Sequence, residues 1–233
     1  MKARACIRVD SGRSVLNAEP PLALRLSYDG IYMVSAAAYP IGGDDVSLDV
    51  DVAPGSTSTI RAAAATVALP GHDGGESIFT VRARVGAHGC IHWRPEPLVV
   101  AANCRHRVVA NVEVAAGATL QWRDEMVLGR SGEEPGACAS RLHVERAGAP
   151  LLRHDIVIDE YAQSLGVLGT ARAVGTLLLV GTTAPTMSPM ADIEAEVFPL
   201  ADDAALVVVL GDRVDAVRGS LLDAEECAAR AGR

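Results

Sequence analysis

The chain has 233 residues, of which 49% are hydrophobic and only 3% aromatic, so it can bury a large core built mainly from small aliphatic side chains. Lys and Arg total 21 against 29 Asp and Glu, and the net charge of -8 opposes binding to nucleic acid and to anionic membranes. Lys2 is the only lysine, which excludes a phosphate-loop lysine and a Schiff-base lysine in the body of the chain.

The N-terminal segment MKARACIRVDSGRS reaches its first charges too early for a signal peptide. The apolar runs TLLLVG and ALVVVLG are far shorter than the ~20 residues that cross a bilayer. Five cysteines without a C-x-x-C pair fit reduced thiols better than a disulfide framework. We therefore expect a cytoplasmic protein without a membrane segment.

The first informative stretch is YPIGGDDVSLDVDVAPG (39–55), which places a glycine pair and two aspartates before an alternating segment. Apolar side chains at Val46, Leu48, Val50 and Val52 alternate with polar ones, which is the period of a half-buried strand. A phosphate-binding loop would continue into a helix and would usually carry a lysine. The glycines therefore predict a turn into a strand and no nucleotide site.

Similar strand–turn–strand units follow along the chain. FTVRARVGAHGCIHW, RVVANVEVAAGATLQW and RLHVERAGAPLLRHD each alternate, turn near a glycine and leave in a second run. With the first stretch, the turn glycines are Gly55, Gly89, Gly117 and Gly148, which lie roughly 30 residues apart. We predict an all-β-dominated fold of stacked β-hairpins, forming a two-layered body that is either β-helix-like or a β-sandwich.

Helical patterns are confined to the C-terminal part of the chain. TMSPMADIEAEVF offers Ser188 as an N-cap with Pro189 at the first helical position. DAVRGSLLDAEECAARAG places four apolar side chains on roughly one helix face, namely Val217, Leu221, Leu222 and Cys227. We predict one or two helices in a C-terminal segment of about 187–230, within a single domain that spans residues 1–233.

No catalytic motif is present: the sequence has no G-x-S-x-G elbow, no H-E-x-x-H and no paired-cysteine zinc motif. The residues with metal-ligand chemistry are His88, Cys90 and His92, followed by Cys104 and His106. If the two segments pair, these ligands could converge on one face. Buried structural cysteines and histidines explain the same pattern, and we favour that interpretation. A stand-alone β-rich metal-binding protein that uses Cys90, His92, Cys104 and His106 is the alternative.

Two further stretches have specific composition. WRPEPLVV sets Glu96 between two prolines, each of which pushes the preceding residue toward extended backbone. EMVLGRSGEEPG ends an apolar run with a glycine-rich segment that contains Arg130 and Glu133. A solvated turn explains the second stretch without any functional role.

In chain order, IGGDDVSLDVDV, WRPEPLVV, VLGRSGE, HVERAGAPLLRHD and LGTARAVGTLLLVG resemble the urease accessory protein family UreD, also called UreH. The resemblance implies a non-enzymatic, largely β-stranded scaffold that joins the accessory protein UreF and the GTPase UreG. It also implies docking on urease apoprotein and passage of nickel toward the urease active site, with an internal water-filled tunnel in the scaffold. The chain departs from the family at Ala63 and Val67, where many members carry a glutamine and a lysine.

Through this resemblance, Asp44, Glu96, Arg130 and Glu133 become the candidate nickel-route or motif residues, and no cofactor is expected to bind tightly. A cation in transit needs oxygen ligands that release it, because thiolate or imidazole coordination would trap it. We expect Asp44 and Glu133 to face a polar interior or to pair with an arginine such as Arg130; simple turn chemistry is the competing interpretation. If they lie on the route, Asp44→Ala or Glu133→Ala should reduce nickel loading of urease, whereas replacing Cys90 and His92 by alanine should not.

Overall fold

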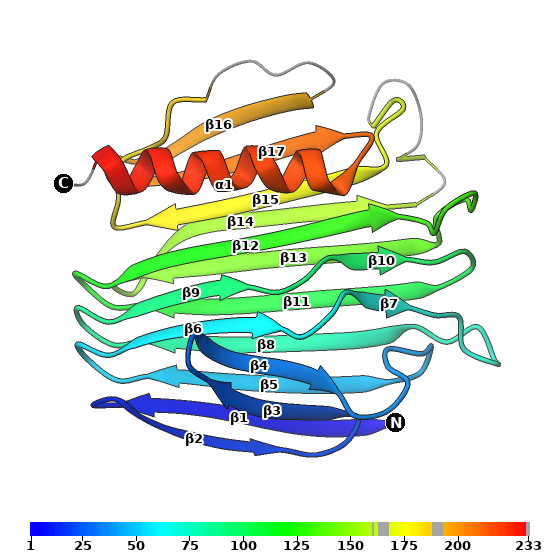
Figure 1. Cartoon of the computed structure of the whole chain (residues 1–233), viewed down its shortest axis with the longest axis horizontal. Coiled ribbons are helices and arrows are strands. Elements are labelled where there is room, and N and C mark those ends of the chain that lie inside the picture. The colour runs from blue at the N-terminus through cyan, green and yellow to red at the C-terminus, as the bar shows by residue number, and fades with distance from the viewer. Residues whose placement is uncertain (160, 163–167, 188–192, 232–233) are drawn as a thin grey trace.

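The structure is a computed structural model that describes residues 1–159, 161–162, 168–187 and 193–231. Two β-sheets form the body, and one helix, α1 (Val214–Ala231), lies across the second sheet (Figure 1). The strand order is β14-β13-β11-β8-β5-β1-β2 in sheet A and β16-β17-β15-β12-β9-β6-β4-β3 in sheet B, where short β10 also pairs with β12 and with β7.

The bounds of the strands follow from the same assignment. Sheet A contains β1 (Lys2–Asp10), β2 (Arg13–Ala18), β5 (Asp45–Val52), β8 (Ser77–Val85), β11 (Arg105–Val114), β13 (Ala137–Arg146) and β14 (Ala149–Ile158). Sheet B contains β3 (Leu22–Ser27), β4 (Gly30–Ser35), β6 (Thr57–Ala62), β7 (Thr66–Ala68), β9 (Cys90–Arg94), β10 (Leu98–Val100), β12 (Thr119–Leu128), β15 (Ala173–Val180), β16 (Ile193–Ala201) and β17 (Ala204–Gly211).

In its middle part the chain adds one strand to each sheet in turn. Strands β5, β8 and β11 pair in parallel in sheet A, and β6, β9 and β12 pair in parallel in sheet B. Parallel neighbours need a crossover connection, and here the strand of the opposite sheet supplies it. The prediction of a stacked, two-layered, β-helix-like body is confirmed.

Three of the predicted hairpins are instead arches that pass from sheet A to sheet B. Residues 53–56, 86–89 and 115–118 make these turns, and the strands on either side of each turn are not paired with each other. Of the four predicted hairpins, only the pair β13 and β14 is a true hairpin, with Ala147 (φ 50°) and Gly148 (φ 80°) as its two turn residues. Two successive residues with positive φ are the requirement of a tight two-residue hairpin turn.

The third position of each arch has a left-handed backbone conformation, and the sequence pattern identified its residue correctly in two of the three arches. Gly55 (φ 68°) and Gly117 (φ 71°) occupy it in the first and third arch, but His88 (φ 56°), and not Gly89, occupies it in the second. The ring of His88 lies against Gly117, where a Cβ atom would stand 2.7 Å from the ring Cε1. Gly117 therefore leaves the space that the His88 ring occupies, in addition to adopting the positive φ of the arch.

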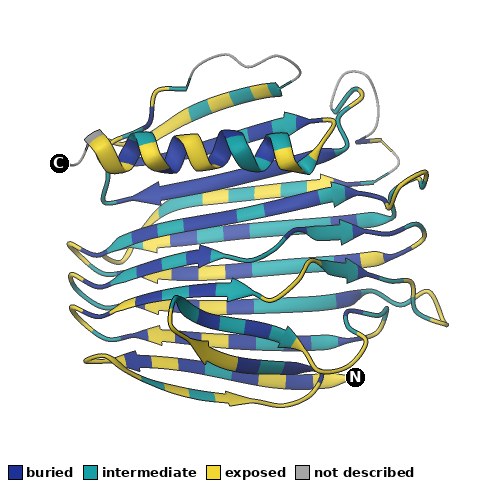
Figure 2. Cartoon of the chain, viewed as in Figure 1, coloured by how far each residue is buried: buried dark blue, intermediate teal, exposed yellow. Residues whose placement is uncertain are grey.

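The main core lies between the two sheets. Alternate residues of the strands are buried, as the banding in Figure 2 shows. The four apolar residues predicted to point inward from β5 are all less than 3% exposed: Val46, Leu48, Val50 and Val52. They join one hydrophobic cluster with residues of sheet B such as Ile60, Leu120 and Leu178, so the aliphatic core that the composition predicts fills the space between the sheets.

Helix α1 packs on the outer face of β15 and β17. Its buried apolar residues are Val217, Leu221, Ala224 and Ala228, which lie in one cluster with Leu177, Leu179, Val207 and Val209. Leu222, predicted for the same face, is exposed, and Cys227 is only partly buried. Alanines complete the buried stripe because the helix lies close to the sheet. No helix in the described part of the chain combines the length and the apolar character needed to cross a membrane.

The helix predicted from TMSPMADIEAEVF is wrong where the structure describes it. Ser188 and Pro189 lie outside the described residues, but Ile193–Ala201 forms the edge strand β16, paired antiparallel with β17. Its exposure alternates along the strand, and the open edge of β17 provides partners that local helix signals do not reveal. Described helix in the predicted segment is thus limited to α1.

Candidate functional site

A cavity of about 280 Å³ lies between the two sheets. Sheet A lines it with residues that include His106 and Ser140, and sheet B with residues that include Trp93, Asp124 and Thr176. The exposed residues Ala63, Ala64 and Ala65 also line it, so the cavity reaches the surface beside the end of β6. This volume has room for several water molecules, and the wall includes polar side chains that can donate or accept hydrogen bonds.

Asp124 is the carboxylate set into the inner wall of this cavity. Its Oδ1 accepts a hydrogen bond from Trp93 Nε1 at 3.1 Å, and its Oδ2 accepts one from Trp122 Nε1 at 2.7 Å. Asp124 is partly buried by its exposed fraction and lines the cavity. Burial raises the pKa of Asp124 and outweighs the two indole hydrogen bonds, which lower it. The surroundings of Asp124 therefore favour its ionised form less than water does.

On the opposite wall, His106 is a neutral polar group. It is 3% exposed, and its Nδ1 lies 2.8 Å from the hydroxyl oxygen of Ser77. Burial lowers the pKa of His106 to about 4, so the imidazole carries no charge near neutral pH. The acidic residues that line the cavity are Glu96, Asp124 and Glu125, and His106 adds a neutral polar group to the wall.

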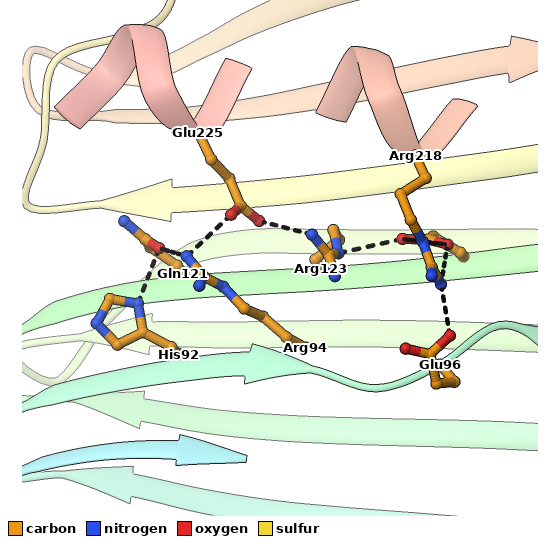
Figure 3. A network of polar contacts seen from close by, with 8 residues as sticks. His92, Arg94, Glu96, Gln121, Arg123, Arg218 and Glu225 are labelled. Carbon is orange, nitrogen blue, oxygen red and sulfur yellow. Dashed lines mark hydrogen bonds and ion pairs between the residues drawn. The ribbon is translucent and has the colours of Figure 1, made fainter. Parts of the chain in front are cut away.

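Glu96 connects the cavity to a network of ion pairs beneath α1 (Figure 3). An oxygen of Glu96 lies 3.0 Å from the guanidinium of Arg218, which projects from α1. The same guanidinium lies 2.8 Å from Glu125 of β12, whose side chain is fully buried. Arg218 of α1 therefore forms ion pairs with two carboxylates, and one of them, Glu96, lines the cavity.

The network continues along the outer face of sheet B. Arg123 pairs with Glu125 at 3.1 Å and with Glu225 of α1 at 3.3 Å, and Arg94 pairs with Glu225 at 2.9 Å. The network therefore contains three arginines and three glutamates: Arg94, Arg123, Arg218, Glu96, Glu125 and Glu225. Charges buried in this way are tolerated only when each has a partner, because desolvation of an unpaired ion costs several kcal/mol.

Asp44, a predicted site residue, closes the turn in front of β5. Its Oδ1 lies 2.7 Å from the amino group of Met1, and its Oδ2 accepts a hydrogen bond from the backbone N–H of Ile41 at 2.9 Å. The side chain is largely buried but does not line the cavity. The GGDD stretch is thus a turn leading into a strand, as the sequence pattern predicted.

Arg130 and Glu133, two other predicted residues, contact each other. Arg130 Nε donates to Glu133 Oε2 at 2.9 Å, which confirms the expected pairing with an arginine. Hydrogen bonds from Arg130 first, and from the backbone N–H of Ala102, lower the pKa of Glu133 to about 2. Gly129 (φ 81°) and Gly132 (φ 76°) make the turn compact. Of the four candidate residues, only Glu96 lines the cavity; a role of the other three in nickel transfer stays a prediction.

The residues considered for a metal cluster are divided between the two sheets. Cys90 and His92 lie on β9 of sheet B, whereas Cys104 precedes β11 of sheet A and His106 lies on it. Strand β9 pairs with β6 and β12, so the condition for convergence is not met. Among the described residues, no group of three or more His, Cys, Asp and Glu side chains is placed to hold a metal ion.

Sequence reasoning missed Asp124 and the ion pairs beneath α1. Asp124 falls on the inward phase of β12, together with Leu120, Trp122 and Met126, and a carboxylate in such a row is a usable signal. Arg123 and Glu125 fall on the outward phase. Their partners come from α1, far along the chain, and nothing local in the sequence indicates that pairing.

The residue range of the family match decides the identity of the chain. The model of the family described as UreD urease accessory protein matches residues 13–231, which include every described strand except β1, the cavity wall and α1. The chain belongs to the UreD urease accessory protein family. The predicted resemblance is therefore confirmed over nearly the whole chain.

Similar UreD proteins come from several organisms. The urease accessory protein UreD of Frankia casuarinae is 37% identical, over 84% of this chain and 74% of its own length. UreD 1 of Saccharopolyspora erythraea is 38% identical, over 94% and 92%, and UreD 3 of Streptomyces griseus is 37% identical, over 90% and 88%. The UreD similarity thus covers most of each protein.

Proposed function

We propose that this UreD-family protein is a non-enzymatic cytoplasmic scaffold that binds urease apoprotein and the accessory proteins UreF and UreG, and that it assists nickel delivery into the urease active site. The observation that carries the nickel part of this proposal is the cavity between the sheets, with Asp124 in its wall and Glu96 at its link to α1. Family membership supports the accessory role.

The wall of the cavity has the chemistry that a transferable cation needs. Carboxylate, hydroxyl and water oxygens bind divalent cations and release them more readily than thiolates do. A cation that reaches Asp124 favours the ionised form of the carboxylate and offsets the cost of burying its charge. The two indole N–H groups hold both oxygens of Asp124 in place, so the carboxylate need not reorganise.

The scaffold part is tested by co-purification. Tagged chain is co-expressed with UreF, UreG and urease apoprotein, and we expect all of them in the purified complex. If the chain retains none of these proteins, the scaffold proposal is wrong, whatever the cavity does.

The nickel part is tested with Asp124→Asn, which keeps the size of the side chain, removes its charge and leaves one of the two indole N–H groups without its acceptor. We expect assembly to be unchanged and the rate of nickel loading of urease to fall by about ten-fold, since a carboxylate ligand to a divalent ion is lost. Asp49→Asn is the matched control, because Asp49 is exposed on the outer face of sheet A. A complex that forms with Asp124→Asn and loads nickel at the normal rate would place the route outside this cavity.

A further inference from the structure

A cysteine, a histidine and a glutamine form a relay on the outer face of sheet B, near the network beneath α1. Cys90 Sγ lies 3.2 Å from His92 Nε2, and His92 Nδ1 lies 2.8 Å from Gln121 Oε1. Cys90 and His92 share a face because they are two residues apart on β9. The parallel pairing of β9 with β12 places Gln121 directly beside His92.

A neighbouring arginine determines the direction of the protons in this relay. Arg94 Nη2 donates a hydrogen bond to the same Gln121 Oε1 at 2.8 Å (Figure 3). A guanidinium can only donate, so the amide oxygen, and not the amide nitrogen, faces both Arg94 and His92. Nδ1 of His92 must then carry a proton, and Nε2 presents its lone pair to the Cys90 thiol.

The surroundings favour transfer of the thiol proton to the imidazole. Partial burial raises the pKa of Cys90, but the hydrogen bonds from His92 and Thr119 and the charge of Arg94 outweigh it, and the pKa is lowered. The hydrogen bond to Cys90 in turn raises the pKa of His92. From α1, Glu225 is the charged group nearest in this network, and it pairs with Arg94 and not with the relay itself.

Other cysteines of the chain are in different environments. Cys104 and Cys138 are buried among apolar residues, and burial raises their pKa values to about 11 and about 12. Cys6 and Cys227 are partly exposed, as Cys90 is. The arrangement of thiol, imidazole and orienting amide oxygen around Cys90 is the one that activates a nucleophilic sulfur.

We propose that Cys90 is an activated thiol and a modification site for small peroxides, with His92 as its base and Gln121 as the residue that orients the base. In the reaction, the Cys90 thiolate attacks one peroxide oxygen and the O–O bond breaks. The sulfur is oxidised to a sulfenic acid, and the hydroxide that leaves takes the proton from His92 to form water. This site is separate from the cavity and does not depend on the proposed role in nickel delivery.

The first test is alkylation of the native protein with iodoacetamide at pH 6.5, followed by peptide mass spectrometry. We expect Cys90 to react at least about ten-fold faster than Cys6 and Cys227, because only thiolate reacts. In His92→Gln, Cys90 should react at the rate of Cys6. Equal rates at the three cysteines of the native protein would overturn the proposal, and so would an unchanged Cys90 rate in His92→Gln.

Protection of Cys104 and Cys138 from alkylation reports that a variant is folded. If His92→Gln exposes them, the pH profile of the wild-type protein decides: Cys90 must lose its reactivity at lower pH than Cys6 does, and coincident profiles would contradict the relay. Hydrogen peroxide followed by dimedone should then label Cys90 before Cys6 and Cys227. Dimedone labelling spread evenly over these cysteines would exclude selective oxidation.

Discussion

The outer faces of sheets A and B both carry arginines next to acidic side chains, but on sheet B helix α1 covers part of the face. On sheet A, Arg84 and Glu113 lie 3.0 Å apart with side chains that are 70% and 61% exposed. On sheet B, Arg123 and Glu125 lie 3.1 Å apart with exposures of 7% and 0%. Water screens the first pair, whereas the second has replaced its water with protein partners. Breaking the buried pair should therefore lower the free energy of unfolding more than breaking the exposed pair.

The largest effect is expected when the covered network loses one member. Arg123→Met leaves Glu125 and Glu225 buried with one cation fewer, and we expect the free energy of unfolding to fall by about 3–5 kcal/mol. Urea unfolding followed by circular dichroism measures it. Arg84→Met on sheet A is the matched control with the same chemical change. Equal losses for the two variants would show that burial does not distinguish the faces.

The comparison extends to a single buried titratable group. The pKa of His106 is about 4 in the folded chain, below the ~6.5 of an unfolded chain, so the unfolded chain binds more protons between these values. Stability should therefore fall by roughly 2–3 kcal/mol as the pH drops from about 6.5 to about 4. His106→Gln should lack this component, which urea unfolding at both pH values measures. If the wild-type protein and His106→Gln lose the same stability between these pH values, the pH dependence comes from other groups.

Contact between helix and sheet can be tested with a pair of glycine substitutions. A Cβ at Gly175 would stand 2.5 Å from Val217 Cγ1, so Gly175→Ala forces α1 outward and should cost about 1–3 kcal/mol. Gly219 on α1 has no atom within 4 Å of such a Cβ, and Gly219→Ala should stabilise the protein by roughly 0.5–1 kcal/mol. Thermal unfolding measures both shifts. A stabilising Gly175→Ala would mean that α1 is not pressed against β15.

The smallest effect belongs to the exposed pair on sheet A. A double-mutant cycle of Arg84→Ala and Glu113→Ala should give a coupling energy below about 1 kcal/mol, which decreases further in high salt. Urea unfolding of the four proteins at two salt concentrations measures it. A larger, salt-independent coupling would indicate that this face is covered in solution.

Strand content and the inward side of β5 could be predicted from alternation alone, and α1 from its apolar stripe. The path of the chain after each strand could not. Ala147 and Gly148 fold back in a two-residue hairpin, whereas 53–56 carries the chain to the other sheet. Both contain a small-residue turn with glycine, and the number of residues between the strands makes the difference. His88 in a glycine position adds to this ambiguity.

The candidate site was predictable only where its contacts are local. Arg130 and Glu133 are three residues apart, and their pairing follows from a tight turn. Asp124 is hydrogen-bonded by Trp93 of the neighbouring strand β9, and Arg123 is paired with Glu225 of α1. Those partners are known only once strand order and helix position are fixed, because pairing between distant segments leaves no periodic signal in either segment.

The parallel pairing of β9 and β12 also has a spectroscopic consequence. Trp93 and Trp122 are the only tryptophans of the chain, and their rings stack with centroids 4.5 Å apart and planes inclined by 9°. Both indole N–H groups donate to the carboxylate of Asp124. All tryptophan emission therefore originates at the inner wall of the cavity. Exciton coupling between the two rings marks the intact stack in near-ultraviolet circular dichroism, so the protein carries its own label for whatever reaches Asp124.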